Sequence, residues 1–128
     1  MTQEDKELIF KELCARLPYH VKCKIWIKDG TTEEGLLDLQ HNYGNVLQDA
    51  FYYNKIKDIK PYLFPLSSMT EEEKEEYCQL QQRVIYNSKG VINEDVTKYI
   101  NWCNKKHLDI NNLIPMELAI DATNLNIY

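Results

Sequence analysis

The stretch YHVKCKIWIKDG, residues 19–30, constrains the fold more than any other part of the chain. Every second position is apolar, at Tyr19, Val21, Cys23, Ile25 and Ile27. Because side chains of a strand alternate between two faces, this pattern predicts a half-buried strand. Asp29-Gly30 is a strong hairpin signal, so the chain is expected to return as a second strand over residues 31–40.

Further strands are expected before residue 64. Residues 41–45 have turn composition, and NVLQDAFYY, residues 45–53, predicts a third strand. A shorter fourth strand is expected over residues 57–63, where Pro61 favours an edge or an end of the sheet. Two arrangements suit about four consecutive short strands. One is a small open barrel of the SH3 or Sm type, and the other is a plain meander with helices packed on one face.

Helices are expected both before and after the strands in the sequence. Over residues 2–17, Thr2 can cap a helix with Asp5 as its capping-box partner. The apolar residues of this segment recur at helical spacing, at Leu8, Ile9, Leu13 and Leu17. Pro18 then ends the helix, because the residue before a proline is pushed toward extended geometry.

Two more helices are expected at residues 69–86 and 93–107. Three glutamates, residues 71–73, follow the cap candidates Ser67, Ser68 and Thr70 and favour the start of a helix. Tyr77, Leu80, Val84 and also Cys78 are expected to face inward. In the helix expected at residues 93–107 the apolar residues follow an i, i+3, i+4, i+7 pattern, at Val96, Tyr99, Ile100 and Cys103.

The chain as a whole predicts one α+β domain over residues 1–128. It comprises a helix at 2–17, a short antiparallel sheet at 19–64, helices at 69–86 and 93–107, and an extended tail at 108–128. The 128 residues include four cysteines without a paired spacing, and the opening MTQEDKE is unlike a signal peptide. Reduced cysteines and a cytoplasmic location are therefore expected, and no apolar stretch approaches membrane-spanning length.

The polar face of the first strand is the best candidate for a binding surface. It carries His20, Lys22, Lys24, Trp26 and Lys28, and Lys55, Lys57 and Lys60 are candidates to lie nearby. Tyr52 and Tyr53 would place one ring on each face of the third strand, so one of them can join Trp26. Basic residues around an aromatic ring suit single-stranded nucleic acid. The favoured interpretation is a solvated strand face, because the net charge of −5 argues against a generally anion-binding surface.

The segment WCNKKHLD, residues 102–109, is the most chemical stretch of the chain. Cys103 and His107 can share a helix face and suggest a metal site or a thiol nucleophile. The favoured interpretation is structural: Cys103 belongs to the apolar stripe, and residues 105–107 place cations at the negative end of the helix. Asp109 can then accept a hydrogen bond from a loop amide or pair with His107. No phosphate-loop, dinucleotide or hydrolase motif occurs, so neither a cofactor nor a catalytic residue is predicted.

Three segments resemble small proteins of gut Bacteroides and of their phages and mobile elements. These are ELCARLPYHVKCKI (12–25), IKPYLFPLSSMTEEEKEEY (59–77) and YINWCNKKHLDINNLIPMELAIDA (99–122), together about half of the chain. Asn111 departs from the group, where an aromatic or basic residue is more usual. The resemblance implies an origin, and it transfers neither a catalytic residue nor a substrate.

The leading hypothesis is a non-enzymatic protein, associated with a phage or mobile element, that binds another protein. The acidic balance, the missing catalytic motifs and the resemblance favour it. The alternative is a nucleic-acid-binding module that uses the face around Lys22, Lys24, Trp26 and Lys28. A second alternative is a metal- or thiol-dependent enzyme at Cys103 and His107. The sequence predicts no particular oligomeric state.

Overall fold

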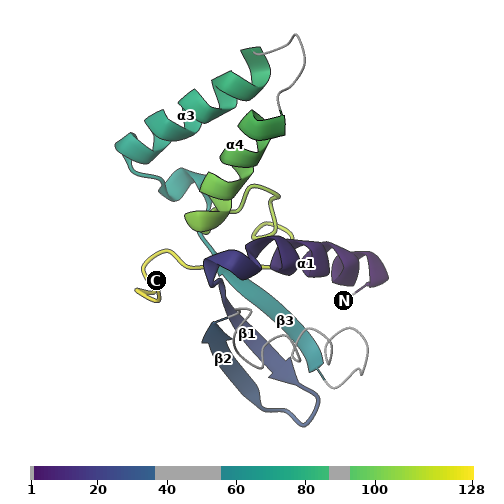
Figure 1. Ribbon diagram of the computed structural model, residues 1–128. Helices are drawn as coiled ribbons and strands as arrows, with labels where there is room; N and C mark the ends of the chain where they lie inside the picture. Colours follow the sequence, from purple (N-terminus) through teal and green to yellow (C-terminus); the bar gives the residue numbers. More distant parts are fainter. Residues whose placement is uncertain (1, 37–55, 87–92) are drawn as a thin grey trace.

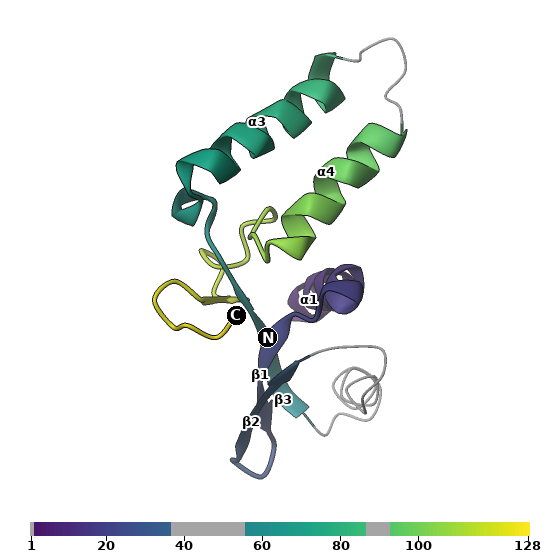
Figure 2. The same cartoon turned by 60° about the vertical axis from the view of Figure 1, so that its left-hand side comes forward.

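Figure 1 shows the computed structural model, which describes residues 2–36, 56–86 and 93–128. Helix α1 lies against a four-stranded sheet, and helices α3 and α4 project from it as a helical pair (Figures 1 and 2). The predicted α+β class is thereby confirmed. Within the described ranges, no helix is long and apolar enough to cross a membrane.

Helix α1, Gln3–Arg16, begins with the predicted capping box. The Thr2 hydroxyl accepts a hydrogen bond from the Asp5 N–H at 3.1 Å, and the Asp5 carboxylate accepts one from the Thr2 N–H at 3.2 Å. These bonds satisfy two backbone groups that the first turn of a helix leaves unpaired. The predicted position of the first helix is therefore correct.

A 3-10 turn at Leu17–Tyr19, which includes Pro18, separates α1 from the sheet. His20 then adopts a left-handed conformation with φ of 56° and turns the chain into the first strand. Tyr19 was expected to begin this strand, and that expectation was wrong because the proline turn occupies its position.

The sheet has the strand order β2-β1-β3-β4. Strand β1, Lys22–Ile27, lies antiparallel between β2, Thr32–Leu36, and β3, Ile56–Leu63. The predicted hairpin turn joins β1 to β2, and Gly30 takes a φ of 94° in it, where an L side chain would be strained. Strand β4, Ile120–Asp121, comes from the tail and pairs parallel with the end of β3. The described strands form an open sheet with β2 and β4 at its edges, so the sheet is not confined to residues 19–64.

Pro61 was predicted to restrict this strand to an edge or an end, but the eight-residue β3 lies between β1 and β4 in the sheet. Pro61 lies opposite Cys23 of β1, the last direct pair of the β1–β3 ladder at this end. The Lys22 N–H points toward β3, where it reaches the Tyr62 carbonyl through the hydroxyl of Tyr128. Strand alternation therefore turns the Pro61 nitrogen away from β1. Strand β4 pairs only from Tyr62 onward, so the missing N–H removes no bond of the β3–β4 ladder.

The third predicted strand, residues 45–53, lies outside the described residues. The turn expected at 41–45 lies outside them as well, together with Tyr52, Tyr53 and Lys55.

Helices α3, Glu71–Tyr86, and α4, Asn93–Lys105, confirm the two predicted C-terminal helices. Thr70 and Glu73 form a second capping box, with bonds of 3.2 and 3.0 Å between each side chain and the other's N–H. The two helices meet at Tyr77 and Tyr99, whose hydroxyl oxygens lie 3.0 Å apart. Cys78, which was expected to face inward, is exposed.

Helix α4 ends two residues earlier than predicted, in a left-handed turn at His107. The His107 N–H donates to the Asn104 carbonyl at 3.0 Å, and the Leu108 N–H donates to the Cys103 carbonyl at 3.0 Å. This bond pair, with His107 at φ of 57°, is a Schellman motif. It turns the chain so that Leu108 pairs with Phe64 at the end of β3.

The interior has two apolar clusters. The larger fills the space between α1, the sheet and the tail, and is formed by Ile9, Leu13, Val21, Cys23, Ile25, Ile59, Leu63, Leu113, Leu118 and Ala119. The smaller comprises Met69, Cys103 and Leu108, with partly buried aromatic rings around it. This second cluster joins the helical pair to the end of β3.

Candidate functional site

The outer face of the sheet carries the predicted binding residues of β1. Val21, Cys23 and Ile25 are buried against α1, whereas Lys22, Lys24 and Trp26 are half-buried on the opposite face. The predicted two-residue alternation is therefore correct. We call the outward residues of β1 and their cross-strand neighbours the outer sheet face.

Two cross-strand rows define the centre of this face. Lys24 lies opposite Glu34 of β2 and Lys60 of β3. In the next row, Trp26 lies opposite Thr32 and Asp58. Residues directly opposite one another in an antiparallel pair share a face, so these side chains project to the same side.

Trp26 is held between two ammonium groups. The Nζ atoms of Lys24 and Lys60 lie 5.4 and 5.6 Å from the centroid of its ring. At partly exposed sites such cation–π contacts contribute about 0.5–1 kcal/mol each. The two lysines thus restrain the only described tryptophan of the sheet while leaving part of its ring accessible.

Two carboxylates share this face with the lysines. The Glu34 Oε1 accepts a hydrogen bond from the Tyr62 hydroxyl at 2.6 Å. Burial of Tyr62, and next this bond to Glu34, raise the pKa of the tyrosine to about 12. The Asp58 Oδ1 accepts a bond from the Ile59 N–H at 2.9 Å. The outer sheet face is therefore a surface of mixed charge around one aromatic ring.

The structure brings only part of the predicted patch together. Lys60, which was named as a possible neighbour, contacts Trp26. Lys28 lies beyond the end of β1 and is exposed. Lys57 lies at an irregularity of the β1–β3 pairing, between Asp58 opposite Trp26 and Ile56 opposite Ile27, and it is exposed there. Tyr52 and Tyr53 lie outside the described residues.

The geometry of Cys103 is that of a core residue rather than of a nucleophile. Its side chain has 0% exposure, and burial raises its pKa to about 11. A thiol that is both shielded and protonated at neutral pH does not attack a substrate. Among the residues that the structure describes, no group of three or more His, Cys, Asp or Glu side chains is arranged to hold a metal ion.

His107 is not the cation that the end of α4 was expected to carry. Burial, and next the nearby positive charge of Arg16, lower its pKa to about 4, so its imidazole is neutral at pH 7. Its ring stacks on that of Tyr128, with centroids 3.9 Å apart. Asp109 accepts bonds from the Leu113 and Ile114 N–H groups at 2.8 and 2.9 Å, which confirms its expected role as a loop acceptor.

A buried ion pair in α1 was not predicted. The Arg16 side chain has 0% exposure and its Nη2 lies 2.6 Å from the Glu12 Oε1. Arg16 also donates to the Leu108 carbonyl, and Asn111 donates to the second Glu12 oxygen. The sequence signal for this ion pair was the i, i+4 spacing of Glu12 and Arg16 next to the apolar stripe of the helix.

Comparisons with protein-family models, with curated proteins and with solved structures gave no match to this chain. The geometry of the described surface is therefore the basis for any inference about function.

Proposed function

We propose that this chain is a non-enzymatic binding protein that contacts another protein through its outer sheet face. The observation that carries the proposal is the Trp26 ring, which is half-buried between Lys24 and Lys60. Tryptophan is enriched among the few residues that supply most of the free energy of protein–protein binding. A ring already restrained by its neighbours loses little side-chain entropy when a partner covers it.

The mixed charge of this face supports a protein partner. Glu34 and Asp58 lie in the same cross-strand rows as Lys24 and Trp26. Carboxylates at these positions repel the phosphates of a nucleic acid but can pair with basic side chains of a protein. Charged groups of both signs fix the orientation of a protein partner, because a misplaced partner meets like charges.

A nucleic-acid partner is the second candidate. The arrangement of two lysines at one tryptophan ring favours it, since a base can stack on the ring while the ammonium groups meet phosphates. Binding of this kind weakens steeply as the salt concentration rises. Titration of labelled single-stranded DNA at low and high salt separates this candidate from the first.

The origin and location of the protein are also matters of proposal. The three segments that resemble proteins of Bacteroides phages and mobile elements support an origin in such an element. All four cysteines are free thiols, and Cys14 and Cys78 are exposed. Exposed free thiols fit a reducing compartment, which supports a location in the cytoplasm of the host cell.

Quantitative capture from a host-cell lysate tests the proposed function. The bait is the full chain, and the test variant is Trp26→Ala. Loss of a central tryptophan should reduce capture of the partner about thirtyfold, the effect of removing roughly 2 kcal/mol of binding free energy. Nuclease treatment of the lysate should leave capture unchanged.

Lys11→Glu provides a control, because Lys11 is exposed on α1, which packs against the other face of the sheet. This variant should capture the partner as well as the unchanged chain does. Equal capture by Trp26→Ala and the unchanged chain would contradict the proposal, and so would loss of capture after nuclease treatment.

A further inference from the structure

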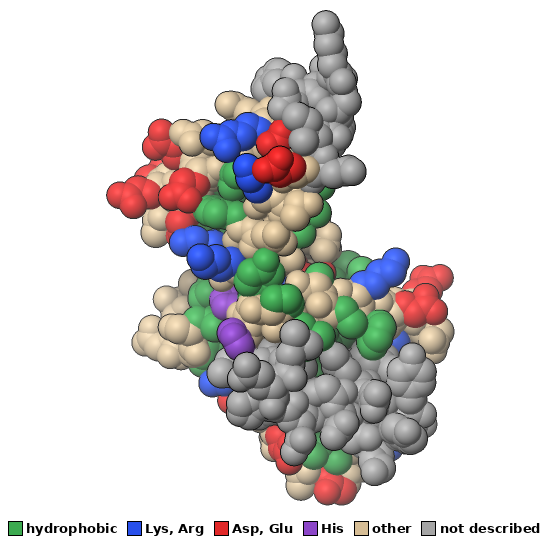
Figure 3. All heavy atoms as spheres, viewed as in Figure 1, with side chains coloured by type: hydrophobic (Ala, Val, Ile, Leu, Met, Phe, Trp, Pro, Cys, Tyr) green, Lys and Arg blue, Asp and Glu red, His purple; other side chains and the backbone are tan. Residues whose placement is uncertain are grey.

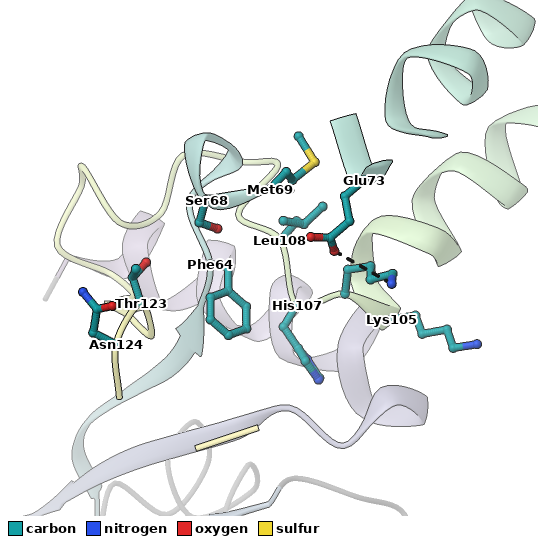
Figure 4. Close-up of a pocket in the computed structure, with 10 residues that line it drawn as sticks. Phe64, Ser68, Met69, Glu73, Lys105, His107, Leu108, Thr123 and Asn124 are labelled. Carbon is teal, nitrogen blue, oxygen red and sulfur yellow. Dashed lines mark ion pairs between the residues drawn. The ribbon is translucent and has the colours of Figure 1, made fainter. Parts of the chain in front are cut away.

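A cavity of about 420 Å³ lies between the start of α3, the end of α4 and the tail. Its size is within the range of small-molecule sites in proteins. Apolar side chains of Phe64, Met69 and Leu108 form one part of its wall. Figure 4 shows these three residues together with Glu73, which extends from α3 beside Leu108 and toward the lysine with which it pairs.

The charged part of the wall comes from two helix ends. Lys105 and Lys106 stand at the end of α4, and Glu73 stands in the first turn of α3. The Lys106 Nζ lies 3.8 Å from the Glu73 Oε2, and both side chains are partly exposed to solvent. Two lysines against one glutamate leave the wall with a net charge of +1, given the neutral imidazole of His107.

Two polar atoms in the wall lack a hydrogen-bond partner within the described part of the chain. They are the His107 Nδ1 and the Thr123 Oγ1, and both residues line the cavity. Both atoms lie beneath the cavity surface, so a ligand engages them only after a small side-chain rotation. A buried polar group without a partner is destabilising, and an oxygen-bearing ligand can supply the missing bond.

We propose that this cavity binds a small organic monocarboxylate, with the carboxylate near Lys106 and an apolar portion against Phe64, Met69 and Leu108. A single negative charge matches the net charge of the wall, whereas a doubly charged phosphate is disfavoured by the Glu73 carboxylate. The cavity lies at the junction of the helical pair with β3, away from the outer sheet face. The proposal is therefore independent of the protein-binding function.

Amide NMR spectra of the full chain, titrated with sodium benzoate, test the proposal. Saturable shifts are expected at the amides of Phe64, Lys106 and Thr123. Benzyl alcohol, which has a similar ring without the charge, and phenyl phosphate, which carries a second charge, should each bind about tenfold more weakly.

Two variants of opposite sign make the test specific. Lys106→Gln should weaken benzoate binding about tenfold, since Glu73 then faces the ligand without the ammonium group that pairs with it. Glu73→Gln keeps a capping-box residue at the start of α3 but removes the repelling charge, so it should strengthen binding of benzoate and of phenyl phosphate. Lys98→Gln, an exposed site on α4 away from the cavity, is the control and should leave the affinity unchanged.

Three results would overturn the proposal. They are the absence of saturable shifts at the cavity, equal binding of benzoate and benzyl alcohol, and changes of the same sign in Lys106→Gln and Glu73→Gln. A well-dispersed spectrum of each variant establishes that it is folded.

Discussion

Arg16 is a fully buried charge, and its partners come from distant parts of the chain. Glu12 neutralises it from one turn earlier in α1, and the Leu108 carbonyl accepts a further hydrogen bond. Asn111 completes the set by donating to Glu12 at 2.7 Å. Breaking a buried ion pair leaves an uncompensated charge in the interior, which costs about 3–5 kcal/mol. This pair therefore ties α1 to the segment that follows α4.

The pair can be tested with three variants at these two positions. Glu12→Leu should lower the free energy of unfolding by about 3–5 kcal/mol, because Arg16 loses its counter-charge in the interior. Arg16→Met leaves Glu12 unpaired and should have a similar effect. The double variant should lose much less than the sum of the two, since no buried charge remains. Urea denaturation measures all three, and additive losses would show that the two residues act independently.

His107 makes the stability of the protein depend on pH. Its pKa falls from an ordinary value of 6.5 to about 4 in the folded state, chiefly because of burial. The folded state thus binds a proton at His107 less readily than the unfolded chain does. This contribution to stability is complete above pH 6.5 and is lost as the pH falls toward 4.

His107→Asn isolates this effect, because asparagine accepts the left-handed conformation but does not titrate. Between pH 7 and pH 4.5 the unchanged chain should lose about 1–2 kcal/mol more stability than the variant, a figure that allows for solvent screening. Denaturation curves at several pH values give the difference. Parallel pH profiles for the two chains would show that the pKa of His107 is not lowered in the folded state.

The Tyr128 hydroxyl joins strands β1 and β3. It accepts a hydrogen bond from the Lys22 N–H of β1 at 2.7 Å and donates to the Tyr62 carbonyl of β3 at 2.8 Å. In a regular ladder these two backbone groups would bond to each other. The tail therefore completes the pairing of β1 with β3, and the stack on His107 holds the ring in place.

Tyr128→Phe should keep the ring stack but leave both backbone groups without a partner. We expect it to cost about 1–3 kcal/mol of stability and to accelerate hydrogen exchange at the Lys22 amide. Tyr62→Phe is the matched control, since it removes a hydroxyl from the same strand pair but only its bond to Glu34. Faster exchange at Lys22 in both variants, or in neither, would contradict the bridging role of Tyr128.

Local signals allowed most elements to be predicted from the sequence. The capping residues at Thr2 and Thr70, the alternation in β1 and the turn at Gly30 each act within a few residues. Strand β4 was missed because a two-residue parallel pairing has no local signature and depends on where α4 releases the tail. The interior position of β3 was missed because the proline was considered without the register that turns its nitrogen away from β1.

The candidate site, too, could be predicted only where local signals were enough. Alternation was enough to place Lys22, Lys24 and Trp26 on one face. The carboxylates of Glu34 and Asp58 join them only through pairing with β2 and β3, so the mixed charge of the face required the register. The burial of Arg16 and the neutral state of His107 likewise arise from contacts with distant segments.

Charges of both signs lie at both ends of the molecule. The sheet carries lysines and carboxylates around Trp26, and acidic and basic side chains also lie over the helical pair (Figure 3). An extended surface for nucleic acid would be basic along its length, as phosphate binding requires. A partner that docks on the sheet instead meets a restrained aromatic ring, a residue type enriched at protein interfaces, with charges of both signs around it.

Site-specific photo-crosslinking in the host cell tests the central claim most directly. A photoreactive amino acid at Lys24, on the outer sheet face, is compared with the same group at Lys11, which is exposed on α1 and so on the other side of the sheet. The account predicts one discrete protein adduct from position 24 and none from position 11. Adducts from both positions alike, adducts to nucleic acid, or no adduct from position 24 would contradict it.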